Sequence, residues 1–129
     1  MARTEITVTV SDHDGVWLPG PEPSDPTNDM EIPNNDGSII LILQNLSLST
    51  RTVVVEAAAT YGDPAIPLVD RTYTLGVGTA ASARQTAGPF SPRLFNQSGD
   101  LSTQSVLVNF DGSAADVDVE AISAPIPVT

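Results

Sequence analysis

The stretch QSVLVNFDGSAADVDVEAIS, residues Gln104–Ser123, carries the clearest indication of the fold class. Apolar side chains recur at every second position in its first half, at Val106, Val108 and Phe110. In its second half, Val117, Val119 and Ala121 alternate with Asp116, Asp118 and Glu120. A period of two is typical of a strand with one face in the core and one in solvent. The dipeptide Asp111-Gly112 between the halves is a strong turn signal and predicts that the two strands form a hairpin.

Strand-like segments of this length recur along the rest of the chain, and none carries an apolar stripe with the 3.6-residue period of a helix. Residues 39–43 are an unbroken apolar run, so we expect both faces of that strand to be covered. Short strands at this spacing predict an all-β fold, a single antiparallel β-sandwich or jelly-roll-like domain. The further segments are EITVTV (5–10), SIILILQN (38–45), RTVVVEAAA (51–59), RTYTLGV (71–77) and TAASARQTA (79–87).

Length and composition limit the class of protein. The chain has 129 residues and no cysteine, which fits one domain and excludes disulfides, thiolate nucleophiles and zinc fingers. Residues 1–10 include Glu5 and lack the apolar core of a signal peptide, and the apolar run 39–43 is too short to cross a bilayer. We therefore expect neither a signal peptide nor a membrane partner.

The charge balance is strongly acidic. Sixteen Asp and Glu residues face five arginines, for a net charge of −11. Residues 1–37 contain eight of the acids and a single arginine. Nucleic-acid binding normally depends on clustered Lys and Arg, so we expect no nucleic-acid partner. The acidity favours a solubility role for these charges, with a specific basic partner as the alternative.

Residues 11–37 interrupt the strand pattern with five prolines, which disfavour both helix and sheet pairing at such spacing. We therefore expect an extended Pro/Asp-rich arm. The chain then divides into a first strand plus arm at 1–37, the β-sandwich at 38–123 and an extended tail at 124–129.

Apolar residues at both ends of the expected arm predict that it is anchored to a surface. Trp17 and Leu18 lie near its start, and Met30 and Ile32 lie near its end. We predict all four as partner-binding residues. For Trp17 the alternative is a lid folded back onto its own sandwich.

The sequence offers little for catalysis. His13, between Asp12 and Asp14, is the only histidine, and there is no nucleophile motif around a serine and no phosphate-binding loop. We expect no enzymatic activity and no cofactor; a small hydrolase built around His13 is the enzyme alternative.

Three short motifs place hard oxygen ligands beside a glycine: SDHDG, NNDG and FDG. None of them completes a calcium-binding loop. Because the same residues are what tight turns require, we interpret the motifs as turns and expect no metal, with adventitious calcium as the alternative.

The stretch AGPFSPRLFNQSGD, residues 87–100, combines two prolines, two glycines and two phenylalanines between strand-like segments. We interpret it as a crossover from one sheet to the other, with Phe90 and Phe95 closing the end of the sandwich. Core packing and partner binding are both open for Phe90. We predict the loop 90–96, with Phe90 and the cation Arg93, as a second partner contact.

The order of these elements resembles a family of viral structural proteins. An acidic Pro-rich lead, IPNNDG before the apolar strand, GPF followed by a second phenylalanine, and VLVNF before a final alternating strand resemble the head decoration, or capsid cement, proteins of tailed actinobacteriophages. These are small all-β proteins encoded beside the major capsid protein. The resemblance covers residues 16–122, whereas the tail 124–129 and the Pro/Asp segment 19–29 depart from it.

The resemblance implies a structural virion protein that is made in the host cytoplasm and sits on the outer capsid surface. Its expected partners are the major capsid protein and further copies of itself, since such proteins often form trimers. The alternative is a β-sandwich receptor- or carbohydrate-binding module of a virion or cell surface. If residues 1–37 are a capsid-binding arm, their deletion should weaken capsid binding far more than it lowers the melting temperature.

Overall fold

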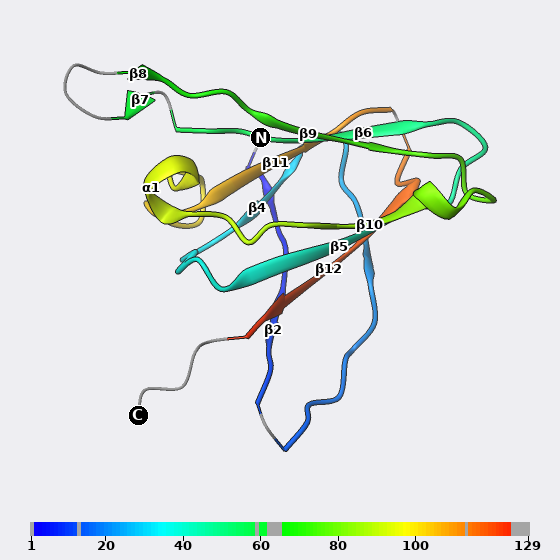
Figure 1. The fold of residues 1–129 in the computed structure, drawn as a ribbon, viewed down its shortest axis with the longest axis horizontal. Coiled ribbons are helices and arrows are strands. Elements are labelled where there is room, and N and C mark those ends of the chain that lie inside the picture. Colours follow the sequence, from blue (N-terminus) through cyan, green and yellow to red (C-terminus); the bar gives the residue numbers. More distant parts are fainter. Residues whose placement is uncertain (1, 13, 59, 62–65, 113, 125–129) are drawn as a thin grey trace.

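The computed structural model describes residues 2–12, 14–58, 60–61, 66–112 and 114–124. Two five-stranded sheets face one another (Figure 1). The apolar side chains between them form the core. The predicted all-β sandwich is confirmed. Its jelly-roll-like topology stays a prediction. His13 and the tail residues 125–129 lie outside the described residues.

The first sheet has the order β1 (Thr4–Glu5), β4 (Met30–Ile32), β11 (Val106–Phe110), β6 (Arg51–Val55) and β9 (Arg71–Leu75). The second has the order β10 (Arg84–Ala87), β5 (Ile39–Asn45), β12 (Val117–Ser123) and β2 (Val8–Val10), and β3 (Glu22–Pro23) also pairs with β12. A separate pair consists of β7 (Thr60–Tyr61) and β8 (Ile66–Pro67). The helical turns are η1 (Ala81–Ala83) and α1 (Pro92–Phe95).

The predicted hairpin between the last two strands is wrong. β11 pairs with β4 and β6 in the first sheet, whereas β12 pairs with β5 in the second. Asp111 exchanges two hydrogen bonds with Thr52, one through its amide (3.2 Å) and one through its carboxylate (3.0 Å). These bonds extend the pairing of β11 with β6 past the end of the strand. The turn therefore carries the chain from one sheet to the other.

The sheets are mixed, so the expectation of a wholly antiparallel sandwich is also wrong. β1 is parallel to β4, and β2 is parallel to β12. The expected strand 5–10 is divided between the two sheets at Ile6, which is fully buried. The Ile6 amide donates to the Glu31 carbonyl at 2.9 Å, which holds the crossing point against β4.

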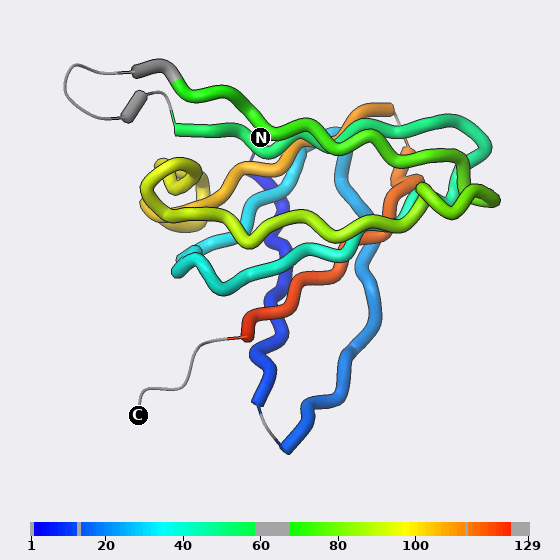
Figure 2. Tube along the Cα trace, viewed as in Figure 1, coloured from blue at the N-terminus to red at the C-terminus, as the bar shows by residue number. Residues whose placement is uncertain are grey.

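The division at residue 37 is wrong as well, because residues 1–37 supply β1 to β4. Met30 and Ile32 are 1% and 0% exposed and pack in the core. They cannot serve as the predicted surface anchors in this fold. Four of the five prolines of residues 11–37 lie outside the short strands, and Pro23 is the last residue of β3. The segment therefore pairs with the sheets despite its composition. Of the described residues of this segment, 11–12 and 14–21 project from the sandwich, and we call this part of the chain the finger loop (Figure 2).

The apolar strand β5 has one covered face rather than two. Ile39, Leu41 and Leu43 are buried, whereas Ile40 between them is 37% exposed. The expected strand 79–87 is confirmed only from Arg84, because residues 81–83 form η1.

Replacing Met30 tests whether β4 belongs to the core. The substitution Met30→Ala removes a buried side chain and should lower the free energy of unfolding by about 2–5 kcal/mol. Urea unfolding followed by circular dichroism measures the loss. The conservative Met30→Leu variant should lose less than about 1.5 kcal/mol. A loss below about 0.5 kcal/mol in Met30→Ala is what a surface position would give, and would contradict this packing.

Candidate functional site

The crossover predicted for residues 87–100 is confirmed. The chain leaves the second sheet at β10, forms α1 and an isolated bridge between Gln97 and Ser105, and enters the first sheet at β11. Phe90 and Phe95 are 1% and 8% exposed, and their rings meet edge to face with centroids 5.5 Å apart. Both rings fill the core, as the sandwich-end interpretation requires. The prediction of Phe90 as a partner contact is therefore wrong.

A buried asparagine fastens this crossover to the start of β5. The Asn35 side-chain amide donates to the Phe90 carbonyl (2.9 Å) and to the Asn96 side-chain oxygen (2.7 Å). The Asn96 side-chain amide in turn donates a hydrogen bond to the Asn35 backbone carbonyl at 2.9 Å. The motifs IPNNDG and GPF thus meet in one polar cluster at the end of the core. Their role in the fold is to fix a corner.

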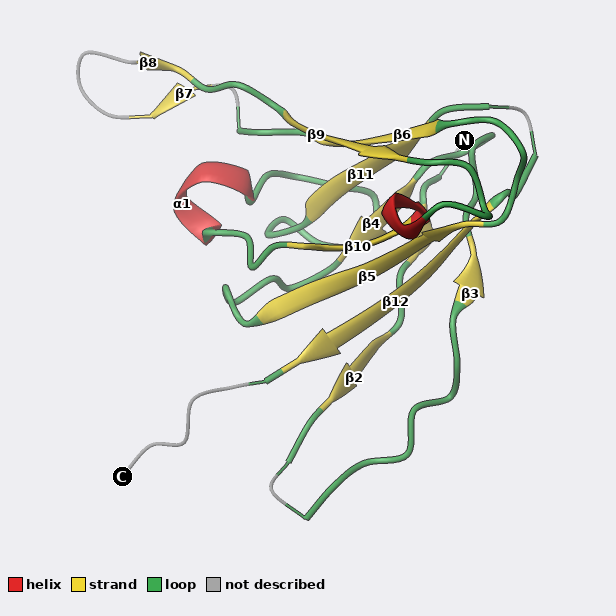
Figure 3. Cartoon of the chain, turned by 45° about the vertical axis from the view of Figure 1, so that its right-hand side comes forward, coloured by secondary structure: helices red, strands yellow, loops and turns green. Residues whose placement is uncertain are grey.

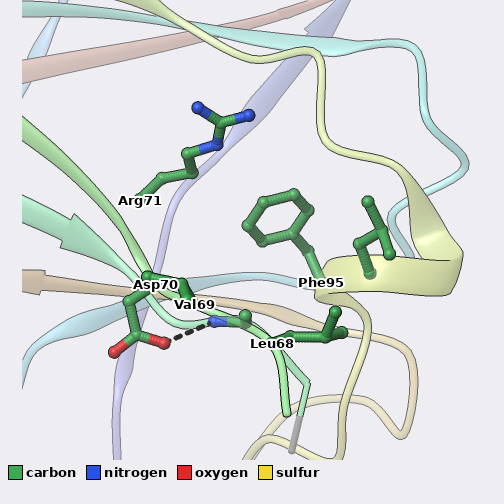
Figure 4. Close-up of a pocket in the computed structure, with 7 residues that line it drawn as sticks. Leu68, Val69, Asp70, Arg71 and Phe95 are labelled. Carbon is green, nitrogen blue, oxygen red and sulfur yellow. Dashed lines mark hydrogen bonds between the residues drawn. The ribbon is translucent and has the colours of Figure 1, made fainter. Parts of the chain in front are cut away.

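Arg93 lies exposed on α1, and its role as a partner contact stays a prediction. Beside α1 is a cavity of about 280 Å³, which opens at the exposed Val69 (Figure 4). The Asp70 carboxylate at its edge accepts the Ala57 amide at 2.8 Å and is directed away from Phe95. This cavity could not be predicted from the sequence, because its walls come from three separate segments. They are Ala57, Leu68, Val69, Asp70, Arg71, Leu94 and Phe95.

The finger loop projects from one edge of the second sheet, and both of its roots lie on β12 (Figure 3). On the outgoing side, the Ser11 amide donates to the Ser123 carbonyl at 2.7 Å. On the returning side, the Ser24 amide donates to the Val117 carbonyl at 2.8 Å. The Glu22 carboxylate accepts the Thr7 amide at 2.8 Å and so ties the two sides together. The roots are thereby fixed by hydrogen bonds on both sides.

Three consecutive apolar side chains are exposed on the finger loop. Trp17 is 96% exposed, Leu18 51% and Val16 43%. The alternative in which Trp17 folds back as a lid on its own sandwich is therefore wrong. Near this point the Asp12 carboxylate accepts the Asp14 amide at 2.8 Å, and the Asp12 carbonyl accepts the Gly15 amide at 3.1 Å. These bonds form the turn that presents the apolar residues.

Sequence reasoning missed a buried carboxylate on β4. Glu31 is fully buried, and its Oε1 atom accepts the amides of Asp100 (2.8 Å) and Leu101 (3.2 Å). Arg3 lies nearby, where it donates to the Met30 carbonyl and pairs with Glu56 at 3.3 Å. Glu31 thus fastens the loop after Gln97 over the outside of the first sheet. A signal existed in the sequence, since Glu31 stands between the apolar residues Met30 and Ile32.

Two aspartates have carboxyl groups with a lowered pKa. Hydrogen bonds from the Ser38 hydroxyl and amide lower the pKa of Asp36 below its usual 3.8. The Thr4 hydroxyl, followed by the backbone and side chain of Asn28, lowers the pKa of Asp25. The NNDG motif thus uses its carboxylate within its own turn, which favours the interpretation as a turn.

Within the described ranges, no group of three or more His, Asp or Glu side chains is placed to hold a metal ion. The same part of the chain contains no helix long and apolar enough to cross a membrane. Comparison with protein-family models, with curated proteins and with solved structures found no match. The functional proposal therefore depends on the exposed residues of this structure, and the most exposed large apolar side chain among those described, Trp17, lies on the finger loop.

Replacing Asn35 tests the structural role of the corner. The substitution Asn35→Ala leaves the buried Phe90 carbonyl and the Asn96 side chain without these bonds, and should lower the free energy of unfolding by about 1–3 kcal/mol. Urea unfolding measures the loss. The exposed Ser98→Ala variant is the control and should change it by less than about 0.5 kcal/mol. Equal stability of the two variants would contradict the role of Asn35.

The Asp36 turn should contribute to stability in a pH-dependent way. Because the folded-state pKa is depressed, this contribution is present above the usual value of 3.8 and is lost as pH falls through the lower folded value. The substitution Asp36→Asn should therefore destabilise the protein most near neutral pH. The difference from the unsubstituted chain should shrink below about pH 4 in urea titrations. A difference that stays constant to about pH 2 would contradict the assignment.

Proposed function

We propose that this protein decorates a phage capsid from the outside and stabilises it by binding the lattice of the major capsid protein. The observation that carries the proposal is the finger loop, which holds Trp17 almost fully in solvent on hydrogen-bonded roots. The resemblance of residues 16–122 to capsid cement proteins supplies the partner.

A tryptophan exposed in this way suits protein recognition. Large aromatic side chains are enriched among the residues that dominate binding energy at interfaces. Burying Trp17 together with Val16 and Leu18 in a partner would remove adjacent apolar surface from water. The hydrogen bonds at both roots and the two prolines of the loop reduce the conformational entropy lost on binding.

Stabilisation of a capsid then follows from mass action. A protein that binds the assembled shell and not its separate subunits shifts the equilibrium toward the shell. If each copy contacts more than one capsid subunit, the contacts add through a high effective concentration. The finger loop supplies one contact in this scheme. The exposed face of α1 with Arg93 supplies the second, and we retain it as part of the proposal.

Binding to particles tests the proposal. Purified protein should co-sediment with expanded capsids that lack it, assembled from the major capsid protein of the phage that encodes this chain, and should raise their melting temperature. The substitution Trp17→Ala should weaken the affinity by about 30-fold or more, as expected for a residue that contributes about 2 kcal/mol or more. The unfolding midpoint of this variant should match that of the unsubstituted protein.

The exposed Leu48, at 84%, provides the matched control because it lies outside the finger loop. Leu48→Ala should bind capsids like the unsubstituted protein. Failure of the unsubstituted protein to bind capsids would overturn the proposal. Trp17-dependent binding on a glycan array, without capsid binding, would replace it with the carbohydrate-binding alternative.

A further inference from the structure

Within the described part of the chain, the charged residues that flank the apolar residues of the finger loop are acidic. Asp12 and Asp14 precede Trp17 and are exposed, and Glu22 follows at the returning root. Residues 10–29 contain no lysine or arginine. Of the five arginines of the chain, Arg3 and Arg51 form ion pairs with Glu56 and Asp116 on other parts of the molecule.

A groove at the base of the finger loop extends this acidic surface. The groove has a volume of about 300 Å³ and lies between the returning side of the loop and β12. Two carboxylate residues, Glu22 and Glu120, line it, and no basic residue does. We call Asp12, Asp14, Glu22 and Glu120 the acidic collar. The other residues that line the groove are Thr7, Thr9, Pro19, Gly20, Pro21, Val119 and Ala121.

We call Val16, Trp17 and Leu18 the apolar tip of the finger loop. The apolar tip and the acidic collar together restrict the chemistry of a partner surface. Trp17, Val16 and Leu18 require an apolar socket, because their burial is favourable only against apolar groups. The collar requires lysine or arginine around that socket, since like charges placed together at an interface repel one another. An anionic lipid surface or a nucleic acid would be repelled by the same charges.

The collar and the tip would act at different stages of binding. Charges on the rim of an interface mainly change the association rate, because they attract the partner before contact. Buried aromatic groups mainly change the dissociation rate. The loop backbone is already shaped for this task, since Gly15 and Gly20 take positive φ angles of 88° and 100° and stand in open space.

We propose that the finger loop seats Trp17 in an apolar socket rimmed by Lys and Arg on the capsid surface, with the acidic collar steering the approach. This inference rests on the proposed function and adds the chemistry of the partner surface. It predicts that the charges of the acidic collar change mainly the association rate, whereas the apolar contact of Trp17 changes mainly the dissociation rate.

Binding kinetics on immobilised expanded capsids test the inference. The double variant Asp12→Asn/Asp14→Asn removes two collar charges and keeps a side-chain oxygen for the turn at Asp12. Its association rate should fall about threefold to tenfold, and its dissociation rate should change by less than about twofold. Trp17→Ala should show the reverse pattern, with dissociation about 30-fold faster. Raising the salt concentration should slow the association of the unsubstituted protein.

A second double variant controls for net charge. Asp70→Asn/Asp100→Asn also removes two charges, and both positions lie outside the finger loop. Each of these carboxylates accepts a backbone amide, which the oxygen of asparagine can also accept. Its association rate should stay within about twofold of the unsubstituted value. An equal slowing in the two double variants, or faster association at high salt, would overturn the inference and leave capsid binding intact.

Two further outcomes identify other occupants. If the unsubstituted protein does not bind capsids, the proposed function fails and the inference fails with it. If native mass measurements show oligomers that Trp17→Ala or Arg71→Glu dissociates, the socket is the cavity beside α1 of a second copy. That result would overturn the assignment of the socket to the capsid.

Discussion

The pairing of both edges of β12 is the constraint on which the shape of this molecule depends. One edge of this seven-residue strand pairs with β5 along its whole length. Its other edge pairs with two strands that run in opposite directions, β2 beside residues 121–123 and β3 beside residues 118–119. The chain that joins β2 to β3 must therefore leave the sheet and come back to it. The finger loop is the result of this double pairing, which also covers an edge that could otherwise bind other strands.

The sequence predicted the sandwich well where strands are long and alternate clearly. β12 shows this, because its buried residues recur at every second position. In β11, Val106, Val108 and Phe110 are buried as predicted, and Leu107 between them is buried as well. The partners of these strands could not be predicted, since Asp111-Gly112 signals a turn and not the sheet that the chain enters next. The hydrogen bond from the Thr52 amide to the Asp111 carboxylate joins residues 59 positions apart and ties this turn to β6 of the first sheet. The parallel pairs that make the sheets mixed could not be predicted either, because parallel pairing depends on contacts between residues distant in sequence.

The N-terminal third was misinterpreted because its strands are too short to show a period. β4 has three residues, all of them buried, with Glu31 between two apolar neighbours. Of the candidate site, Trp17, Leu18 and Arg93 were predicted and are exposed. The groove between Glu22 and Glu120 was not predicted, because the residues that form it are almost 100 positions apart. The corner around Asn35 shows that the most distinctive motifs of a sequence can serve the fold and not a site.

The position of Trp17 decides which optical signals report on this protein. The chain has one tryptophan, and its side chain is 96% exposed in the folded state. Its fluorescence therefore reports on the environment of the finger loop and should change little when the core unfolds. Contact with a partner surface would move the same indole out of water and alter its emission. The chain thus contains an intrinsic probe that responds to docking and is almost insensitive to folding.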